Sequence, residues 1–194
     1  MDIKKYKEHS SWPILKDLYI TDEIIKDFEE HTRNSGMNEK YRMIFQIEGD
    51  KWNRWIFQNL IWYVEFVRIE YLGINPDGVC EAIPGDPETI NKMLRNSPAV
   101  LARLHVCYCE VDEIYKKLSS IIWRACPSVM TIEDKRAEKY FYTVHMRAVR
   151  EKLGKAVEDI IERIQVLKKV QVEALSIYRV SNNAEIAAQP KRNT

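Results

Sequence analysis

The chain has 194 residues, 45% of them hydrophobic and 30% charged, which is enough to bury a core and argues against disorder over most of its length. Its 30 basic and 29 acidic residues leave a formal net charge of +1, so no overall field draws the chain to nucleic acid or to anionic membranes. The longest unbroken apolar run covers residues 60–64, whereas a membrane span needs roughly 20 apolar residues, so no membrane contact is expected.

Residues 1–72 are expected to form an N-terminal helical lobe. Thr21 precedes two acidic residues, which is typical of a helix start because the hydroxyl caps the helix and the carboxylates lie near its positive end. Residues 41–48 alternate in part as a strand would, but no partner strand follows, so a short helix is favoured. Asp50 is expected to cap a further helix that runs to about Leu72 and is apolar around most of its circumference.

A Pro/Gly-rich linker is predicted over residues 73–88, which contain three of the six glycines and three of the seven prolines. Near its end, Asp86 and Pro87 start a short helix, since aspartate is a favoured cap and proline fits the first helical position. After this linker, residues 89–180 are expected to form a long helical hairpin.

The first long helix of the hairpin is predicted over residues 98–125, with Ser97 as its cap and Pro98 at its first position. Its apolar residues alternate spacings of four and three, and they are Val100, Leu104, Cys107, Val111, Ile114, Leu118, Ile121 and Ala125. So regular a stripe is typical of a helix that packs in a bundle, and Pro127 ends it.

The second long helix is predicted over residues 131–180. Its apolar stripe slips phase twice, which favours a nearly straight helix packed on changing neighbours over a strict supercoil. Gly154 leaves open whether this helix is continuous, and the polar residues 181–194 are expected to form a flexible tail. The predicted fold class is therefore all-α, a helical bundle with a long C-terminal helical hairpin.

No catalytic residue, metal site or cofactor is predicted. Residues 73–78 have the glycine spacing of a phosphate-binding loop, but the Lys and the Ser or Thr that should follow are absent. His105, Cys107 and Cys109 form one cluster of metal-ligand residue types, yet Cys107 belongs to the core stripe and no second ligand pair follows.

A cytoplasmic location is expected. Residues 1–19 open with several charged residues and lack the apolar segment of a secretory signal. The four cysteines show no paired spacing, which fits a reducing compartment better than a disulfide framework.

A basic and aromatic segment spans residues 135–155. Cations beside aromatic rings are a feature of grooves that bind single-stranded nucleic acid. The candidate contact residues are Lys135, Arg136, Lys139, Tyr140, Tyr142, Arg147, Arg150 and Lys155. The competing interpretation is a solvated helix face whose aromatic side chains pack inward.

The leading hypothesis is a non-enzymatic structural or assembly protein that self-associates, or binds a protein partner, through its long helices. A helix over residues 98–125 is about 42 Å long, against about 75 Å for the last helix. The part of the longer stripe that the shorter helix does not cover, around Val157 to Ile177, must therefore pack on the N-terminal lobe, another subunit or another protein. The residues predicted to mediate self-association are Val157, Ile160, Ile164, Leu167, Val170 and Ile177. The alternative is a nucleic-acid-binding accessory protein, of the recombination, packaging or nucleocapsid type, that uses residues 135–155.

Overall fold

The computed structural model describes residues 18–34, 39–60, 62–63, 66–67, 71–72 and 86–188. Its elements are α2 (Asp22–Asn34), α3 (Glu39–Trp55), the π-helical turn η3 (Ile56–Leu60), α4 (Pro87–Ala125) and α5 (Ile132–Ala188). No strand occurs in these ranges, which confirms the all-α prediction. Within the same ranges, no helix is both long and apolar enough to cross a bilayer.

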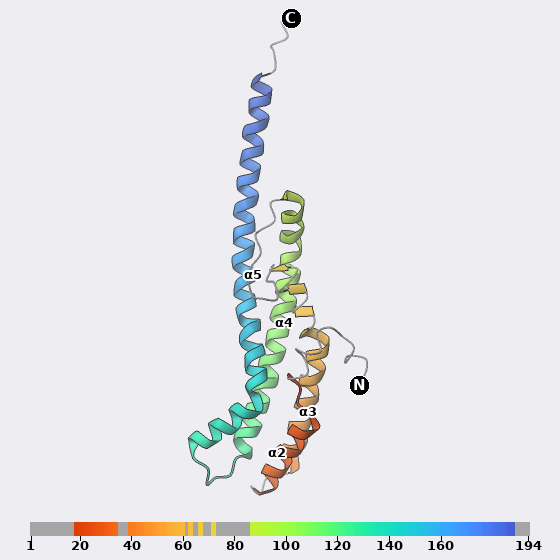
Figure 1. Ribbon diagram of the computed structural model, residues 1–194, viewed down its shortest axis with the longest axis vertical. Helices are drawn as coiled ribbons and strands as arrows, with labels where there is room; N and C mark the ends of the chain where they lie inside the picture. The colour runs from red at the N-terminus through yellow and green to blue at the C-terminus, as the bar shows by residue number, and fades with distance from the viewer. Residues whose placement is uncertain are drawn as a thin grey trace, which may run out of the picture.

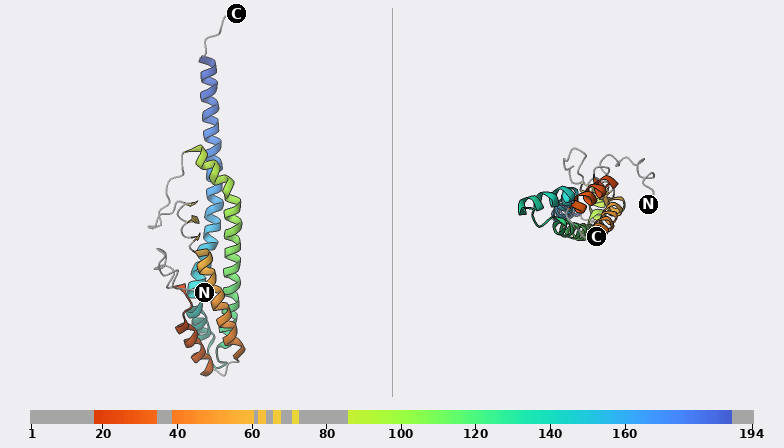
Figure 2. Two further views of the ribbon diagram at one scale, coloured as in Figure 1. Left: turned by 90° about the vertical axis from the view of Figure 1, so that its right-hand side faces the viewer. Right: turned by 90° about the horizontal axis from the view of Figure 1, so that it is seen from below.

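The helical hairpin of α4 and α5 is the frame of the molecule, and its prediction is confirmed. The two helices run side by side, while α2 and α3 lie against the half of the hairpin nearer the α4–α5 connection (Figures 1 and 2). Most of the linker predicted over residues 73–88 falls outside the described residues.

Each hairpin helix begins at a capping residue, Asp86 for α4 and Thr131 for α5. The Asp86 carboxylate accepts hydrogen bonds from the backbone N–H groups of Glu88 and Thr89, the latter at 2.8 Å. The Thr131 hydroxyl accepts from the backbone N–H of Asp134 at 3.1 Å and donates to its carboxylate at 2.8 Å. These bonds satisfy amides of the first turn, which have no partner within a helix.

One hydrophobic core joins the N-terminal helices to the hairpin. Its fully buried members come from every long element and include Phe28 of α2, Phe45 and Trp52 of α3, Leu104, Val111 and Leu118 of α4, and Met146, Leu153 and Ile160 of α5. The regular stripe predicted on the first long helix is confirmed, because all eight of its positions are buried.

The prediction that Pro98 starts a helix is wrong, because α4 is a single helix from residue 87 to residue 125 and contains this proline. A proline inside a helix removes one backbone hydrogen bond and bends the axis. The preceding turn is held by side chains: the Ser97 hydroxyl donates to the Met93 carbonyl oxygen at 2.8 Å, and the Tyr71 hydroxyl donates to the same oxygen at 3.4 Å. The left view of Figure 2 shows the first turns of α4 tilted against the rest.

The predicted cap at Asp50 is also wrong, since α3 continues through this residue. The helical interpretation of residues 41–48 is confirmed. Phe45 and Trp52 lie seven residues apart, about two helical turns, and both are almost fully buried, so one inward face runs across Asp50 without a break.

Helix α5 is continuous through Gly154 and ends at Ala188. The flexible tail predicted from residue 181 is therefore helical as far as residue 188, and residues 189–194 lie outside the described residues. These polar residues are helical because they extend an existing helix, and each residue that joins a helix adds one backbone hydrogen bond.

Helix α5 also changes direction near its start. Figure 1 shows its first turns at an angle to the long remainder. In this part the Thr143 hydroxyl donates to the Lys139 carbonyl oxygen at 2.6 Å, a side-chain bond that bends helices. A cleft, described below, lies between this first part of α5 and the N-terminal helices.

Candidate functional site

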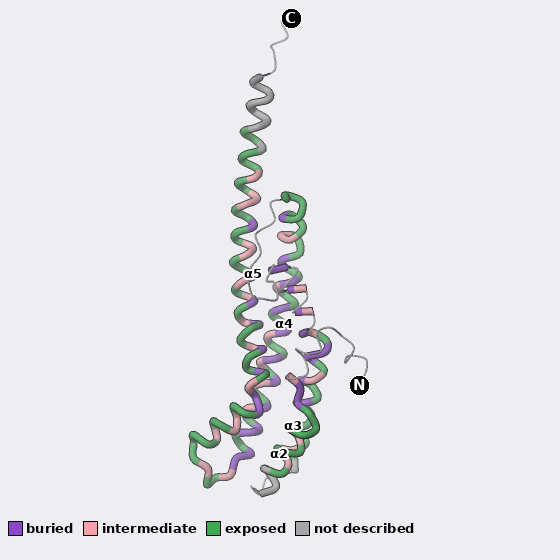
Figure 3. Tube along the Cα trace, in the orientation of Figure 1, coloured by how far each residue is buried: buried purple, intermediate pink, exposed green. Residues whose placement is uncertain are grey.

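The C-terminal end of α5 projects beyond α4 (Figure 1). A side-chain hydrogen bond from Gln171 to Asn91 joins the two helices near the start of α4. From residue 172 to residue 188, here called the projecting segment, none of the described helices runs beside α5. Figure 3 shows most of its described side chains as exposed.

Large apolar side chains lie on the projecting segment. Val172, Leu175, Ile177 and Val180 are each more than half exposed. Val172 and Leu175 lie on one side of the helix, and Ile177 and Val180 lie on another.

The residues predicted to mediate self-association divide into two groups. Ile160 and Leu167 are 0% exposed, and Val157 and Ile164 pack against the core, so these four are covered within the chain. Their cover comes from inside the chain: Arg150 of α5 bonds to Asp112 of α4 and Gln171 bonds to Asn91, so the positions of α5 between these two contacts lie beside α4. Of the predicted set, Ile177 is exposed on the projecting segment, and Val170, just before it, is half-buried.

A second apolar stripe runs along α5 beside the buried one. Val166, Val170, Glu173, Ile177 and Val180 follow each other at spacings of four, three, four and three residues. We call these five positions the outer stripe. Neighbouring residues on a helix point about 100° apart, so the outer stripe lies to one side of the buried face.

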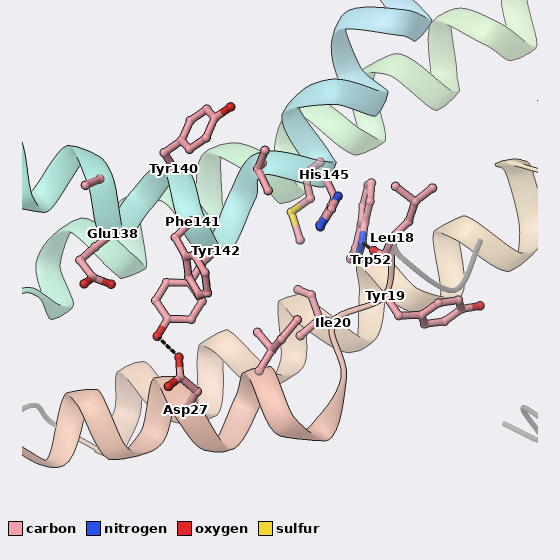
Figure 4. Close-up of a pocket in the computed structure, with 14 residues that line it drawn as sticks. Leu18, Tyr19, Ile20, Asp27, Trp52, Glu138, Tyr140, Phe141, Tyr142 and His145 are labelled. Atoms are coloured by element: carbon pink, nitrogen blue, oxygen red, sulfur yellow. Dashed lines mark hydrogen bonds between the residues drawn. The ribbon is translucent and has the colours of Figure 1, made fainter. Parts of the chain in front are cut away.

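An aromatic cleft of about 700 Å³ lies between the first part of α5 and the N-terminal helices (Figure 4). It is lined by residues 18–20 before α2, by Ile24 and Asp27 of α2, by Trp52 of α3, and by Ala137, Glu138, Tyr140, Phe141, Tyr142, Val144, His145 and Met146 of α5. Sequence reasoning missed this cleft, since its walls come from segments more than a hundred residues apart.

Two hydrogen bonds fix the walls of the cleft. The Tyr142 hydroxyl donates to Asp27 Oδ2 at 2.7 Å, and Trp52 Nε1 donates to the Leu18 carbonyl oxygen at 2.7 Å. Burial and the adjacent Asp27 carboxylate raise the pKa of Tyr142 well above its ordinary value. Tyr142 is therefore held neutral as a hydrogen-bond donor, and it ties α2 to α5.

The lining of the aromatic cleft is mainly apolar and aromatic. Aromatic and aliphatic side chains dominate it, and its lining residues include no cysteine, serine or lysine to act as a nucleophile. Asp27 is already engaged by Tyr142, while His145 is exposed. The cleft has the surface of a site for an apolar or aromatic group.

Several residues of the basic and aromatic segment are already engaged within the chain. Tyr142 is buried and so does not offer a face for stacking. Arg150 Nε lies 2.5 Å from Asp112 Oδ1, and Arg147 Nε lies 2.8 Å from Glu151 Oε1. Each pair offsets a charge that a nucleic acid would need.

The remaining candidates for nucleic-acid contact are more open. Arg136, Tyr140 and Lys155 are exposed, and Lys135 and Lys139 are half-buried. The Arg147 guanidinium lies 5.8 Å from the centre of the Tyr140 ring, within the range of a cation–π contact.

A smaller pocket of about 390 Å³ lies between α3 and α4 and is lined by charges of both signs. Glu48 Oε1 accepts from Lys51 Nζ at 2.7 Å, and Lys117 pairs with Glu113. Its acidic and basic groups offset one another, so this pocket has no strong preference for a ligand of either charge.

The metal-like cluster of the sequence is split by the helix. Cys109 Sγ lies 3.7 Å from His105 Nε2 on the exposed side of α4, while Cys107 is buried in the core. The described ranges contain no group of three or more His, Cys, Asp or Glu side chains placed to hold a metal ion.

Comparison with known proteins finds no family model, curated protein or solved structure that matches the chain.

Proposed function

We propose that this chain is a non-enzymatic assembly protein that self-associates through the C-terminal part of α5. The observation that carries the proposal is the exposed apolar cluster of Val172, Leu175, Ile177 and Val180 on a segment that projects from the rest of the described chain. Apolar surface of this kind gains free energy when it is removed from water.

A helix that stands alone also favours a helical partner. Isolated helices shorter than about 12–15 residues are marginal in water, and most helical stability in proteins comes from packing. The projecting segment, residues 172–188, is only slightly longer than this limit. Pairing with another helix would cover Ile177 and Val180 on one side of the segment and would stabilise its backbone.

A second copy of the chain is the partner we favour. Each copy carries the same apolar stripe with one acidic residue, Glu173, and a nearby base, Lys169. Lys169 Nζ lies 4.0 Å from Glu173 Oε1 within one chain, so both charges border the outer stripe. Two copies therefore offer each other opposite charges beside apolar positions.

The expected affinity is moderate. A fully buried valine or isoleucine side chain contributes roughly 1.5–3 kcal/mol, and association itself costs about 4–15 kcal/mol. The four apolar residues of the outer stripe in each copy, Val166, Val170, Ile177 and Val180, are therefore expected to give a dissociation constant on the order of micromolar. Solution mass should accordingly be followed up to about 100 µM protein.

The test is the solution mass, by size-exclusion chromatography with light scattering, of the full chain and of Ile177→Gln/Val180→Gln. The matched control is Val106→Gln/Val129→Gln, which changes two exposed valines away from the projecting segment. We expect the control to self-associate like the natural chain and the α5 variant to remain at 23.0 kDa. Equal association of both variants would count against the proposal.

A second candidate function is nucleic-acid binding by the start of α5. The observation that favours it is the exposure of Tyr140 and Phe141 close to Arg136 and Lys139. On this hypothesis, Arg136→Glu/Lys139→Glu weakens binding of a single-stranded oligonucleotide, and binding falls steeply with salt. Absent or salt-independent binding would remove it.

A further inference from the structure

We infer that two copies of the chain pair antiparallel along the outer stripe of α5, with Val166 of one copy opposite Ile177 of the other. The inference rests on the proposed self-association and adds its orientation and register. It depends on three features of α5: the spacing of the outer stripe, the place of its single acidic residue, and the length left uncovered.

The outer stripe has the spacing of a coiled-coil seam. Its positions alternate by four and three residues from Val166 to Val180, as the a and d positions of a heptad do. Ile177 is 69% exposed and Val180 is 70% exposed, and Val166, beside the fully buried Leu167, is still 42% exposed. The outer stripe is therefore accessible along its length even where α5 packs on α4.

Glu173 distinguishes between the two orientations. In a parallel pair in register, this glutamate would face the same residue of the second copy in the middle of the seam. Two like charges in a partly desolvated seam repel each other, and removing them from water has a further cost. The parallel arrangement is therefore disfavoured by the residue at its centre.

The antiparallel arrangement offers a register that relieves this repulsion. When Val166 lies opposite Ile177 of the second copy, Val170 lies opposite its Glu173. Lys169 then lies next to that glutamate and supplies the opposite charge. The registers that place Glu173 opposite itself or opposite Ile177 put no lysine beside it.

The same register covers the projecting segments. Residue 172 of one copy lies opposite residue 171 of the other. The projecting segment of each copy therefore runs along α5 of the other copy, from residue 171 towards the N-terminal end of that helix. Both segments thereby gain a helical neighbour along their length, which neither has within its own chain. Val172 and Leu175 lie on another side of the helix, and this pairing does not cover them.

The test is disulfide formation between chains that each carry one introduced cysteine, because a disulfide requires Cα atoms about 4.4–6.8 Å apart. The background chain carries Cys80→Ser and Cys109→Ser and keeps Cys107 and Cys126, which are buried. Into it are placed Val166→Cys, Ile177→Cys or, as a control on the other side of the helix, Val172→Cys. Each chain is oxidised alone and in a mixture with each of the others, and circular dichroism confirms that each is folded.

Antiparallel pairing predicts a disulfide dimer only in the mixture of Val166→Cys with Ile177→Cys. Dimers of Val166→Cys alone and of Ile177→Cys alone would show a parallel pair, overturning the orientation while leaving self-association intact. A dimeric mass with no disulfide at either position, or with one at Val172→Cys, would show that another face is used. A natural chain of 23.0 kDa at every concentration would overturn the proposed function itself.

Discussion

Leu167 and Ile177 lie on the same helix ten residues apart, and their truncation should have opposite consequences. Leu167 is 0% exposed, whereas Ile177 is 69% exposed on the projecting segment. Leu→Ala at a fully buried position costs about 2–5 kcal/mol, and we expect the lower part of this range because Leu167 lies near the open end of the hairpin. Ile177→Ala should change the stability of the single chain by no more than about 0.5 kcal/mol.

The assay is urea unfolding followed by circular dichroism, first at a concentration where the chain is monomeric and then near 100 µM. At low concentration, only Leu167→Ala should shift the midpoint. At high concentration, the natural chain should gain stability from association, as any self-binding native state does, and Ile177→Ala should lose that gain. A loss above about 2 kcal/mol for Ile177→Ala at low concentration would refute the reasoning, because such losses come from buried positions.

Three further predictions concern the core and the cleft. Tyr142→Phe removes the hydrogen bond to Asp27 and should cost about 1.5–3 kcal/mol in the free energy of unfolding, measured in urea, since its acceptor is charged. Burial raises the pKa of Cys107 from about 9.0 to about 11. Between these two pH values the unfolded chain loses the thiol proton and the folded chain keeps it. The free energy of unfolding should therefore be highest below pH 9 and fall by about 2–3 kcal/mol as the pH rises to 11. Cys107→Ala should remove this part of the decline. Gly154→Ala should stabilise the chain by about 0.5–1 kcal/mol in thermal unfolding, because the added methyl would meet the Tyr108 ring at an ordinary 3.4 Å while helix propensity improves; a loss would mean that this contact is tighter.

The hairpin could be predicted from the sequence because its signals are local and agree with each other. The stripe from Val100 to Ala125 and the caps at Asp86 and Thr131 all refer to residues within a few turns of one another. Where spacing, capping and helix-ending residues indicate the same structure, the fold follows with little help from distant contacts.

Pro98 shows where local signals stop being sufficient. A serine followed by a proline is typical both of a helix start and of a bend inside a longer helix. The difference here comes from Tyr71, whose hydroxyl reaches the turn around Ser97 from a segment that is distant in the sequence. Once that turn is held, the helix before Pro98 and the helix after it remain one, and α4 covers more of α5 than the sequence suggests.

The sequence did not predict the aromatic cleft, and of the outer stripe it predicted only Val170 and Ile177 as interaction residues. The cleft depends on the contact between Asp27 and Tyr142, which no periodicity connects. The outer stripe is visible in the spacing of Val166, Ile177 and Val180, but it lies beside a stronger apolar stripe on the same helix. Only the position of α4 shows which of the two stripes is buried and which is left exposed.

The central claim, self-association through the C-terminal part of α5, is tested most directly by sedimentation equilibrium of the full natural chain over a concentration series up to about 100 µM, the range set by the expected affinity. We predict an average mass that rises from 23.0 kDa towards twice that value. A mass that stays at 23.0 kDa at every concentration would contradict the claim.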